Sequence, residues 1–248
     1  MNAADLIPVL LLLLFGVGVT VAAGLILLMV RILRTRQAEP LSLPSWPSLA
    51  TYEGAGYSRR PGCWLVVKSK NLVAVQSALG LHNARPCSLA EGLAGGKLLF
   101  IAPPVHGWIL VTGDGLPDPS ENVDACFRML LDLSQKLGQV QFFKACRILN
   151  HHAWARIENG RVVRAYAWAG TTIWNQGVRT HAERELGLVC YDYGESVERD
   201  DFLETDGVVP NVEKTPLLAA RWSLDPARIE ERFLEDECGV SGELSRRY

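Results

Sequence analysis

The stretch HHAWARIENGRVVRAYAWAG, residues 151–170, decides the fold because it has the features of a complete β-hairpin. Its centre is an Asn-Gly dipeptide, residues 159–160, which favours a two-residue type I′ turn with a positive φ at both positions. Branched and aromatic side chains, which suit a strand, lie on both sides of that turn. Pairing the residues outward from the turn places Trp154 opposite Ala165, a large ring beside a small side chain.

The same pairing predicts which side chains of the hairpin share a face of the sheet. One face is expected to carry Ile157, Val162, Arg164, Tyr166 and Trp168, and the other Trp154, Arg156, Val163, Ala165 and Ala167. Each face is partly apolar, so we expect other elements to cover both. The hairpin is therefore interpreted as structural rather than as a functional site.

Two adjacent histidines open the hairpin. His151 and His152 should point to opposite faces of a regular strand, so they cannot both bind one metal ion. Cys146 with His151 is the nearest pair of potential ligands, whereas a zinc site needs three or four protein ligands. We therefore expect no metal site and no cofactor here, and a histidine at the edge of a core is the simpler interpretation.

Upstream of the hairpin, strand-like and helix-like segments alternate. Apolar runs predict strands at 63–68, 97–104, 107–113 and 140–149, and the patterns between them predict helices at 71–80, from 88 to the glycines at 95–96, and at 118–137. The expected N-caps are Asn71, Ser88, Asp118 and, after the hairpin, Thr180. The fold class predicted is α+β, an antiparallel-rich sheet with two packed helices, and its order is that of a ferredoxin-like βαββαβ sandwich with an added hairpin.

An uncharged apolar run near the N-terminus predicts a single membrane-spanning helix at residues 6–30. A helix of this length is about 37 Å long, enough to cross a hydrocarbon core of about 30 Å. A cleavable signal peptide would have a shorter apolar stretch preceded by basic residues. Here the basic residues Arg31, Arg34 and Arg36 follow the run, which predicts that the N-terminus lies outside an inner (plasma) membrane and that the C-terminal domain is cytoplasmic.

These features divide the chain into five parts. The expected parts are a tail at 1–5, the membrane helix at 6–30, a basic flank and proline-rich spacer at 31–62, an α+β domain at 63–190, and an acidic loop with a C-terminal helical appendage at 191–248. In the appendage, Asp225 and Pro226 should open a helix, and Trp222 should anchor it to the main domain.

Small residues at Gly16, Thr20 and Gly24 share one face of the expected membrane helix because they are four residues apart. Such a face allows two helices to approach closely, so a homodimer or a partner helix is expected there. The alternative is that glycine is simply frequent in membrane helices.

The charge of the chain argues against a nucleic-acid partner. Outside residues 1–36, 22 basic and 26 acidic residues leave a net charge of −4, and there is no block of lysine and arginine. The six cysteines include no C-x-x-C pair. They should be free in a cytoplasmic domain and could form disulfides in an exported one, so the two interpretations depend on the topology.

An acidic stretch at residues 191–213 carries eight acids against one arginine. The candidate partner surface consists of Asp192, Glu195, Glu198, Asp200, Asp201, Glu204 and Asp206. The spacing does not match a calcium-binding EF-hand loop. The alternatives are a solvated loop, a docking surface for a basic partner, or loose divalent-ion binding through Asp200 and Asp201.

Two function hypotheses follow from the sequence. The first is a membrane-anchored protein-interaction module, either a subunit of a membrane assembly or a toxin-neutralising protein. It is suggested by the anchor, the spacer and the acidic stretch, and by a sequence without nucleophile-elbow or phosphate-loop motifs. The alternative is a membrane-tethered hydrolase or transferase that uses Cys63 or Cys146. That enzyme needs a cysteine or an acid close to His106, His151 or His152. Asn175 and Gln176 could line a small pocket near aromatic residues.

Overall fold

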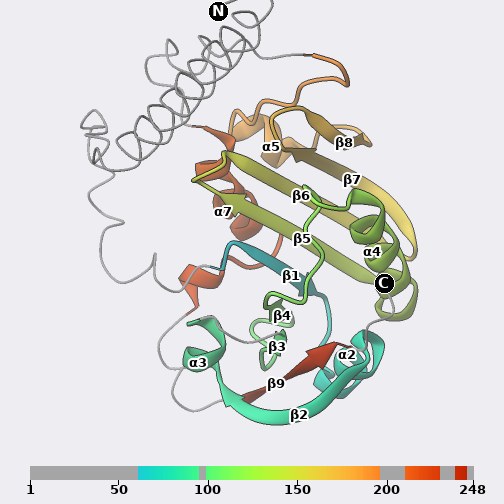
Figure 1. Ribbon diagram of the computed structural model, residues 1–248, viewed down its shortest axis with the longest axis vertical. Helices are drawn as coiled ribbons and strands as arrows, with labels where there is room; N and C mark the ends of the chain where they lie inside the picture. Colours follow the sequence, from blue (N-terminus) through green and yellow to red (C-terminus); the bar gives the residue numbers. More distant parts are fainter. Residues whose placement is uncertain (1–60, 95–98, 196–209, 230–237, 245–248) are drawn as a thin grey trace, which may run out of the picture. The chain divides into compact units, whose positions relative to one another are not determined.

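The computed structural model describes residues 61–94, 99–195, 210–229 and 238–244 (Figure 1). Contacts divide the chain into two units, Met1–Tyr52 and Glu53–Tyr248, and all described residues lie in the second. The expected membrane helix, with its Gly16, Thr20 and Gly24 face, lies outside the described residues. Among those residues, no helix is both long and apolar enough to cross a bilayer.

One open antiparallel sheet forms the framework of the domain, as the α+β prediction requires (Figure 1). Its strands are β1 (Cys63–Val67), β2 (Leu81–Ser88), β3 (Leu99–Ile101), β4 (Ile109–Thr112), β5 (Gln139–Cys146), β6 (His151–Glu158), β7 (Arg161–Trp168), β8 (Thr172–Gln176) and β9 (Cys238–Leu244). They lie side by side in the order β2-β9-β3-β4-β1-β5-β6-β7-β8. The strands β2 and β8 are therefore the two edges.

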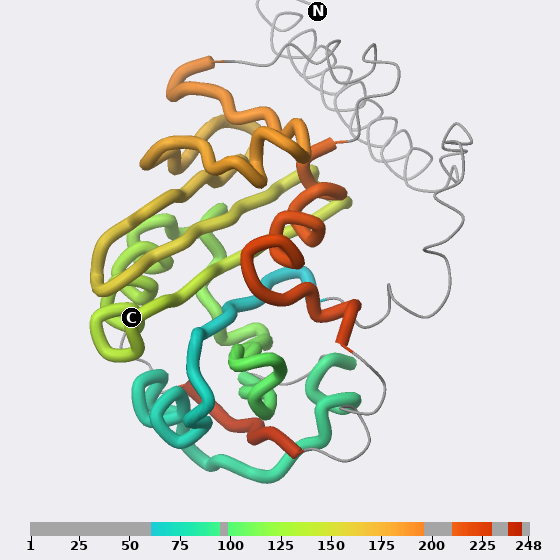
Figure 2. The backbone as a smooth tube through the Cα atoms, turned by 180° about the vertical axis from the view of Figure 1, so that it is seen from behind, coloured from blue at the N-terminus to red at the C-terminus, as the bar shows by residue number. Residues whose placement is uncertain are grey.

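Helices cover both faces of this sheet. They are α2 (Leu72–Leu79), α3 (Leu89–Leu93), α4 (Val123–Leu137), α5 (His181–Glu185), α7 (Asn211–Trp222) and the short 3₁₀ turn η2 (Pro226–Arg228). Helix α4 lies in front of the sheet in Figure 1, and α7 lies in front in the reverse view of Figure 2. Both faces of the central strands are buried for this reason, which explains why β1 is a continuous apolar run.

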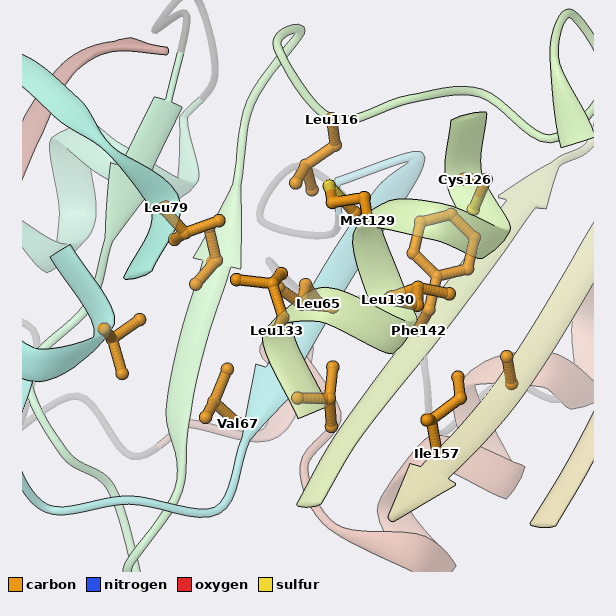
Figure 3. Packing of buried hydrophobic residues seen from close by; sticks show 14 of the residues in the cluster. Leu65, Val67, Leu79, Leu116, Cys126, Met129, Leu130, Leu133, Phe142 and Ile157 are labelled. Atoms are coloured by element: carbon orange, nitrogen blue, oxygen red, sulfur yellow. The ribbon is translucent and has the colours of Figure 1, made fainter. Parts of the chain in front are cut away.

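The first core lies between the sheet and the helices α2 and α4 (Figure 3). Strand alternation sends Leu65 and Val67 of β1 to this face. Helix α4 contributes a buried stripe at the three-and-four spacing of an amphipathic helix, namely Cys126, Met129, Leu130 and Leu133. This is the packed helix that the sequence predicts, and it ends at Gly138 as expected.

The second core lies on the opposite face, beneath α3, α5 and α7. Trp64 of β1 stacks on Phe143 of β5, with ring centroids 5.4 Å apart. Trp222, at the end of α7, packs against the same phenylalanine at 5.9 Å. The prediction that Trp222 anchors the C-terminal part to the main domain is thereby confirmed.

The hairpin has the predicted turn but not the predicted register. Asn159 and Gly160 have φ values of 48° and 74°, as the type I′ turn requires. Beyond the pair Ile157–Val162, the register shifts by one residue, so that Trp154 lies opposite Tyr166 and not opposite Ala165. The shift is a β-bulge that places one extra residue of β7 against β6.

The bulge also changes the predicted faces of the hairpin. Trp154, expected on the opposite face, joins Arg164, Tyr166 and Trp168 on the side of α5 and α7, whereas Ile157, Val162, Ala165 and Ala167 face α4. Without the bulge, Arg164 would follow Val162 onto the α4 side and enter an apolar core. A one-residue slip reverses every side chain beyond it, which is why simple counting from the turn gives the wrong answer.

Three of the four expected helix caps are present, at Asn71, Ser88 and Thr180. The fourth predicted cap, Asp118, is wrong, because α4 begins at Val123 and its N-cap is Asn122. Asp118 instead caps a preceding turn, in which its carboxylate accepts a hydrogen bond from the Ser120 amide at 2.8 Å. That carboxylate is also bonded to Lys144 on β5, which fixes the turn to the sheet before the helix starts.

The strands β2, β8 and β9 and the helix α7 are not predicted by the sequence patterns. Strand β9, expected within a helical appendage, lies inside the sheet between β2 and β3. Its sequence CGVSGEL has low strand propensity, but a Cβ at Gly239 would lie 2.1 Å from the Ile101 carbonyl oxygen, so the close approach needs glycine. The helix expected at Asp225–Pro226 is only the turn η2 within the described residues.

We predict that Gly239→Ala destabilises the domain by about 2 kcal/mol or more, because backbone and the Phe100 ring leave no room for the new methyl group. Gly62→Ala is the control, since nothing lies within 4 Å of its Cβ position, and it should change stability by less than about 0.5 kcal/mol. Chemical denaturation of both variants measures the difference. Equal stabilities would show that β9 does not pack in the sheet as described.

Candidate functional site

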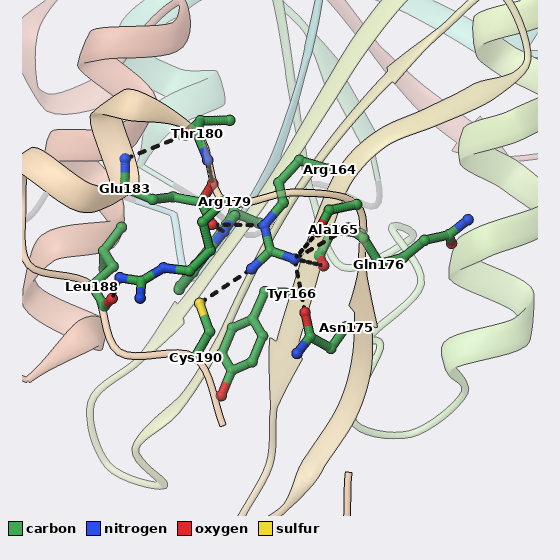
Figure 4. A network of polar contacts seen from close by, with 12 residues as sticks. Arg164, Ala165, Tyr166, Asn175, Gln176, Arg179, Thr180, Glu183, Leu188 and Cys190 are labelled. Carbon is green, nitrogen blue, oxygen red and sulfur yellow. Dashed lines mark hydrogen bonds and ion pairs between the residues drawn. The ribbon is translucent and has the colours of Figure 1, made fainter. Parts of the chain in front are cut away.

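A buried ion pair between Arg164 of β7 and Glu183 of α5 is the centre of the polar structure on the second face (Figure 4). Their side chains are 1% and 0% exposed, and Arg164 Nε lies 2.8 Å from Glu183 Oε1. A fully buried charge is tolerated only when it is paired and hydrogen-bonded. The hydrogen-bond partners of the two side chains therefore decide whether the pair is structural or reactive.

The guanidinium of Arg164 is saturated with acceptors. Its Nη1 donates to the Ala165 carbonyl oxygen and to Asn175 Oδ1, each at 2.8 Å, and to the Gln176 carbonyl oxygen at 3.1 Å. Its Nη2 donates to Cys190 Sγ at 3.2 Å. These partners belong to β7, β8 and the chain after α5, so one side chain joins three segments.

The carboxylate of Glu183 is equally occupied. Oε1 also accepts a hydrogen bond from Trp154 Nε1 at 2.8 Å, and Oε2 accepts from the Thr180 amide at 2.7 Å. Glu183 is thus the second half of the capping box predicted from the sequence and, in addition, the counter-ion of Arg164. A carboxylate with both oxygens engaged is positioned for structure rather than for proton transfer.

A second buried group, His152 on β6, joins the sheet to α7. Its Nδ1 donates to the Asn150 carbonyl oxygen at 3.3 Å, and its Nε2 accepts from Asn211 Nδ2 at 3.1 Å. The ring stacks on Trp154, with centroids 5.8 Å apart. Burial lowers the pKa of His152 to about 4, with the nearby His151 lowering it further and the bond to Asn150 opposing the shift.

The same Asn211 closes the base of a long loop. Its Oδ1 accepts from the Val189 amide at 2.9 Å, and its Nδ2 donates to the Val189 carbonyl oxygen at 2.5 Å. Val189 and Asn211 thereby lie side by side, and we call this pair the loop neck. We call residues 190–210, which lie between these two in the sequence and include the seven residues of the candidate partner surface, the acidic loop.

The first residues of this loop lie along the edge strand β8. Thr172 Oγ1 donates to the Tyr191 carbonyl oxygen at 2.9 Å, and the Tyr193 hydroxyl accepts from the Asn175 amide at 2.7 Å. That hydroxyl also lies 3.4 Å from the Asn175 carbonyl oxygen, to which it donates. Backbone groups of β8 that would otherwise be open to another strand are therefore partly satisfied.

The residues of the expected acidic surface are only partly within the described ranges. Asp192 and Glu195 are exposed and share a turn, in which the Asp192 amide donates to Glu195 Oε2 at 2.8 Å. The remaining five, Glu198, Asp200, Asp201, Glu204 and Asp206, lie outside the described residues. Within those ranges, no group of three or more histidine, cysteine, aspartate or glutamate side chains could hold a metal ion.

The amides expected to line a pocket are engaged in bonds instead. Asn175 belongs to the Arg164 network and also donates from Nδ2 to the Tyr191 carbonyl oxygen at 3.2 Å. Gln176 Oε1 accepts from Trp174 Nε1 at 3.3 Å. An asparagine or a glutamine in a sequence does not indicate which groups it will bond in the fold, so the sequence could not have assigned these hydrogen bonds.

The cysteines of the enzyme hypothesis lie on the neighbouring strands β1 and β5, where Cys63 pairs with Lys144, two residues before Cys146. None of the six, all of which lie in the described ranges, is in a disulfide. Burial raises the pKa of Cys63, and Cys126 and Asp118 raise it further. The pKa of Cys190 is raised to about 11, again chiefly by burial. A higher pKa leaves less thiolate, the reactive form, at neutral pH.

Near Cys63, a small polar cluster fixes the turn that precedes α4. Lys144, almost fully buried, is ion-paired with Asp118 and donates to Ser120 Oγ at 2.7 Å. Burial alone would raise the pKa of Asp118, but hydrogen bonds from Lys144 and Ser120 outweigh this effect and lower it. The Ser120 hydroxyl donates to Asp118 Oδ1 at 2.6 Å and accepts from Lys144, so it is fully engaged within this cluster.

Of the three histidines considered, only His151 lies opposite a cysteine. It pairs with Cys146 in the register of β5 and β6, and its Nδ1 is buried without a hydrogen-bond partner. His152 is enclosed as described, and His106 lies in the exposed turn between β3 and β4 with a φ of 51°. The structure therefore brings together one of the predicted thiol–histidine combinations.

We predict that Glu183→Gln destabilises the domain by about 3 to 5 kcal/mol, because it leaves the buried Arg164 charge without a counter-ion. Glu185→Gln is a matched control on the same helix, since its carboxylate bonds the exposed Arg221 and should contribute no more than about 1 kcal/mol. Urea unfolding followed by circular dichroism compares the two. Equal losses would mean that the buried pair is not a constraint on the fold.

A second prediction concerns pH. The pKa of His152 is about 4 in the fold, below the ordinary histidine value of 6.5 that holds in the unfolded chain, so the unfolded chain binds a proton first as the pH falls. The contribution of His152 to the free energy of unfolding is complete above pH 6.5. It falls by about 3 kcal/mol between pH 6.5 and 4 and changes no further at lower pH. The free energy of unfolding, measured by urea denaturation across this window, should depend on pH less steeply for His152→Gln than for the wild type.

The geometry above is the whole basis for a functional assignment. Comparison with protein-family models, with curated proteins and with solved structures finds no match to this chain. The function therefore has to be argued from the residues and contacts of the domain itself.

Proposed function

We propose that the chain is a membrane-anchored protein-interaction module that presents residues 190–210 to a basic partner. The observation that supports this proposal is the loop neck, where Asn211 bonds both the amide and the carbonyl oxygen of Val189. A loop whose ends are held together has fewer accessible conformations than a free chain of the same length. Its acidic residues are therefore displayed on a fixed base.

Several contacts make this base rigid. Asn211 is bonded to the buried His152, and Tyr191 is held by the Tyr166 hydroxyl, which accepts from its amide at 3.1 Å. Cys190 is bonded to the Arg164 guanidinium. Functional loops are typically placed on a scaffold in this way, and the scaffold here is the second face of the sheet.

The charge of the loop defines the chemistry of the partner. Acids such as Glu198, Asp200, Asp201 and Glu204 far outnumber the single Arg199 between residues 190 and 210. A surface of one sign attracts a partner of the opposite sign and raises the rate of association, with a strong dependence on salt. A lysine- or arginine-rich protein surface fits this requirement, as in a membrane assembly or a toxin-neutralising complex.

The proposed location is the cytoplasmic side of an inner (plasma) membrane. The uncharged residues 6–30, followed by Arg31, Arg34 and Arg36, support a single-pass anchor with the N-terminus outside. The Gly16, Thr20 and Gly24 face supports self-association of that anchor. Free cysteines in the domain agree with a reducing compartment.

We also infer that six elements form a ferredoxin-like core to which the other strands are added. The elements β1, α2, β3, β4, α4 and β5 follow one another in the βαββαβ order, with β2 and α3 inserted. In the sheet, their strands lie in the order β3-β4-β1-β5 and both helices cover one face. Because that fold serves many functions, this inference adds nothing to the choice of partner.

One observation favours a second candidate, thiol chemistry at Cys146. This residue lies directly opposite His151, and the histidine has a buried Nδ1 without a partner. A cysteine activated by that imidazole would be alkylated by iodoacetamide far faster than Cys238, the exposed cysteine of β9. If His151→Ala leaves the alkylation rate of Cys146 unchanged, the thiol candidate is wrong.

The proposed role of the acidic loop is tested by removing its charge. A variant with Glu198→Gln, Asp200→Asn, Asp201→Asn and Glu204→Gln should lose at least about tenfold in affinity for the partner captured by the wild type, with a weaker salt dependence. Capture uses the full chain solubilised in mild detergent, with quantification by mass spectrometry and titration of the purified pair.

A matched control neutralises four exposed acids elsewhere, namely Asp114, Glu121, Asp124 and Glu243. It changes the net charge equally and should keep the wild-type affinity. If both variants bind alike, the loop is only a solvated segment and the proposal fails.

A further inference from the structure

Three buried polar atoms on the second face of the sheet have no hydrogen-bond partner within the described residues. They are the indole nitrogen Nε1 of Trp64, the amide oxygen Oε1 of Gln141 and the hydroxyl oxygen of Ser223. Trp64 and Gln141 are both 0% exposed. Buried polar groups in folded proteins are almost always bonded to protein or to ordered water, because burial removes their bonds to solvent. Each of the three atoms therefore needs a partner.

The three atoms come from segments that meet at the end of α7. Trp64 lies on β1, Gln141 lies on β5, and Ser223 follows the last residue of α7. In the register of β1 and β5, Trp64 is opposite Phe143 and Val66 is opposite Gln141. Trp64 and Gln141 are therefore diagonal neighbours on one face, about 7–8 Å apart, a separation that an aromatic ring and a long side chain can bridge.

Trp222 brings Ser223 to the same point. Its carbonyl oxygen accepts a hydrogen bond from Gln141 Nε2 at 3.4 Å, and its ring packs on Phe143 with the centroids 5.9 Å apart. Trp64 stacks on the same phenylalanine at 5.4 Å. Because Ser223 is joined to Trp222 by a peptide bond, its hydroxyl lies close to the Gln141 amide.

The hydrogen-bonding character of the three groups defines the kind of molecule that fits between them. An indole N–H only donates, an amide oxygen only accepts, and a hydroxyl does both. A cation would be opposed by the indole proton, and an anion would be opposed by the amide oxygen. A small neutral molecule that both donates and accepts hydrogen bonds satisfies all three groups.

We propose that an ordered water molecule is bound between Trp64, Gln141 and Ser223 and attaches the end of α7 to the sheet. It accepts from Trp64 Nε1, donates to Gln141 Oε1 and bonds the Ser223 hydroxyl, which gives the roughly three bonds that a buried water molecule usually makes. Water is the smallest molecule of the required class, and it suits a site enclosed by the closely packed rings of Trp64, Phe143 and Trp222.

This water completes the attachment of α7, the helix that carries one side of the loop neck. At the start of the helix, Asn211 is bonded directly to the buried His152. At its end, the bond from Gln141 to the Trp222 carbonyl oxygen is long, and a water bridge adds bonds to both β1 and β5. The inference concerns the folded domain, so it depends neither on the membrane anchor nor on a partner of the acidic loop.

Trp154 provides a matched control for Trp64. Both residues are 0% exposed and both lie on the second face, but Trp154 Nε1 already donates to Glu183 Oε1 at 2.8 Å. The experiment is an NMR measurement of rotating-frame Overhauser transfer from water to the indole protons of the isotope-labelled full chain in mild detergent. We expect a water cross-peak at the Trp64 indole proton and none at that of Trp154.

A second measurement tests the hydroxyl. If Ser223 bonds a bound water, Ser223→Ala loses a hydrogen bond, and the Tm should fall by about 2 to 4 °C. If the hydroxyl is unpaired, its removal relieves an unfavourable burial and the Tm should rise. Ser134→Ala is the reference, because the Ser134 hydroxyl is buried and accepts from the Gly160 amide at 2.9 Å, so the Tm of this variant should fall.

A water cross-peak at Trp64 alone, together with a lower Tm for Ser223→Ala, supports the proposal. The absence of a cross-peak at Trp64 overturns it, and equal cross-peaks at both indoles overturn it as well, because they indicate general entry of water rather than a bound molecule. A cross-peak from a protein group at residues 230–237 identifies a protein partner in place of water. A higher Tm for Ser223→Ala removes the hydroxyl from the site and contradicts the three-bonded arrangement.

Discussion

The buried ion pair between Arg164 and Glu183 is the interaction on which the second face of the domain depends. It joins β7 to α5, and its further hydrogen bonds reach Trp154 on β6, Asn175 on β8 and Cys190 beyond α5. Breaking a pair of this kind is costly because the remaining charge stays buried and unpaired. The positions of α5 and of the start of the acidic loop follow from it.

The two hydrogen-bond networks on the second face hold the two ends of the acidic loop. The Arg164 network fixes the outgoing end of the acidic loop, and the His152–Asn211 contact fixes its return. The two networks adjoin through Trp154, which donates to Glu183 and stacks on His152. Both ends of the acidic loop are therefore attached to buried groups of the same face.

The hairpin shows how far a sequence can predict such an arrangement. Asn159 and Gly160 specify the turn because few other residues tolerate a positive φ at both positions, and the prediction there is confirmed. The register beyond the turn could not be counted, because the bulge next to Val162 is decided by the need to bring Arg164 to Glu183, nineteen residues away in the sequence. An isolated hairpin has no such need.

The sequence alone determined the α+β class, the helix from Asn71 to Gly80, the amphipathic helix α4 and the capping box at Thr180, because these depend on local patterns of polarity and on single capping residues. Tertiary structure decided the rest. Strand β9 has weak intrinsic propensity and exists because Gly239 fits against Ile101, while the loop neck joins Val189 to Asn211 across 22 residues. Contacts between distant segments leave no periodic signal, so only the folded chain could specify them.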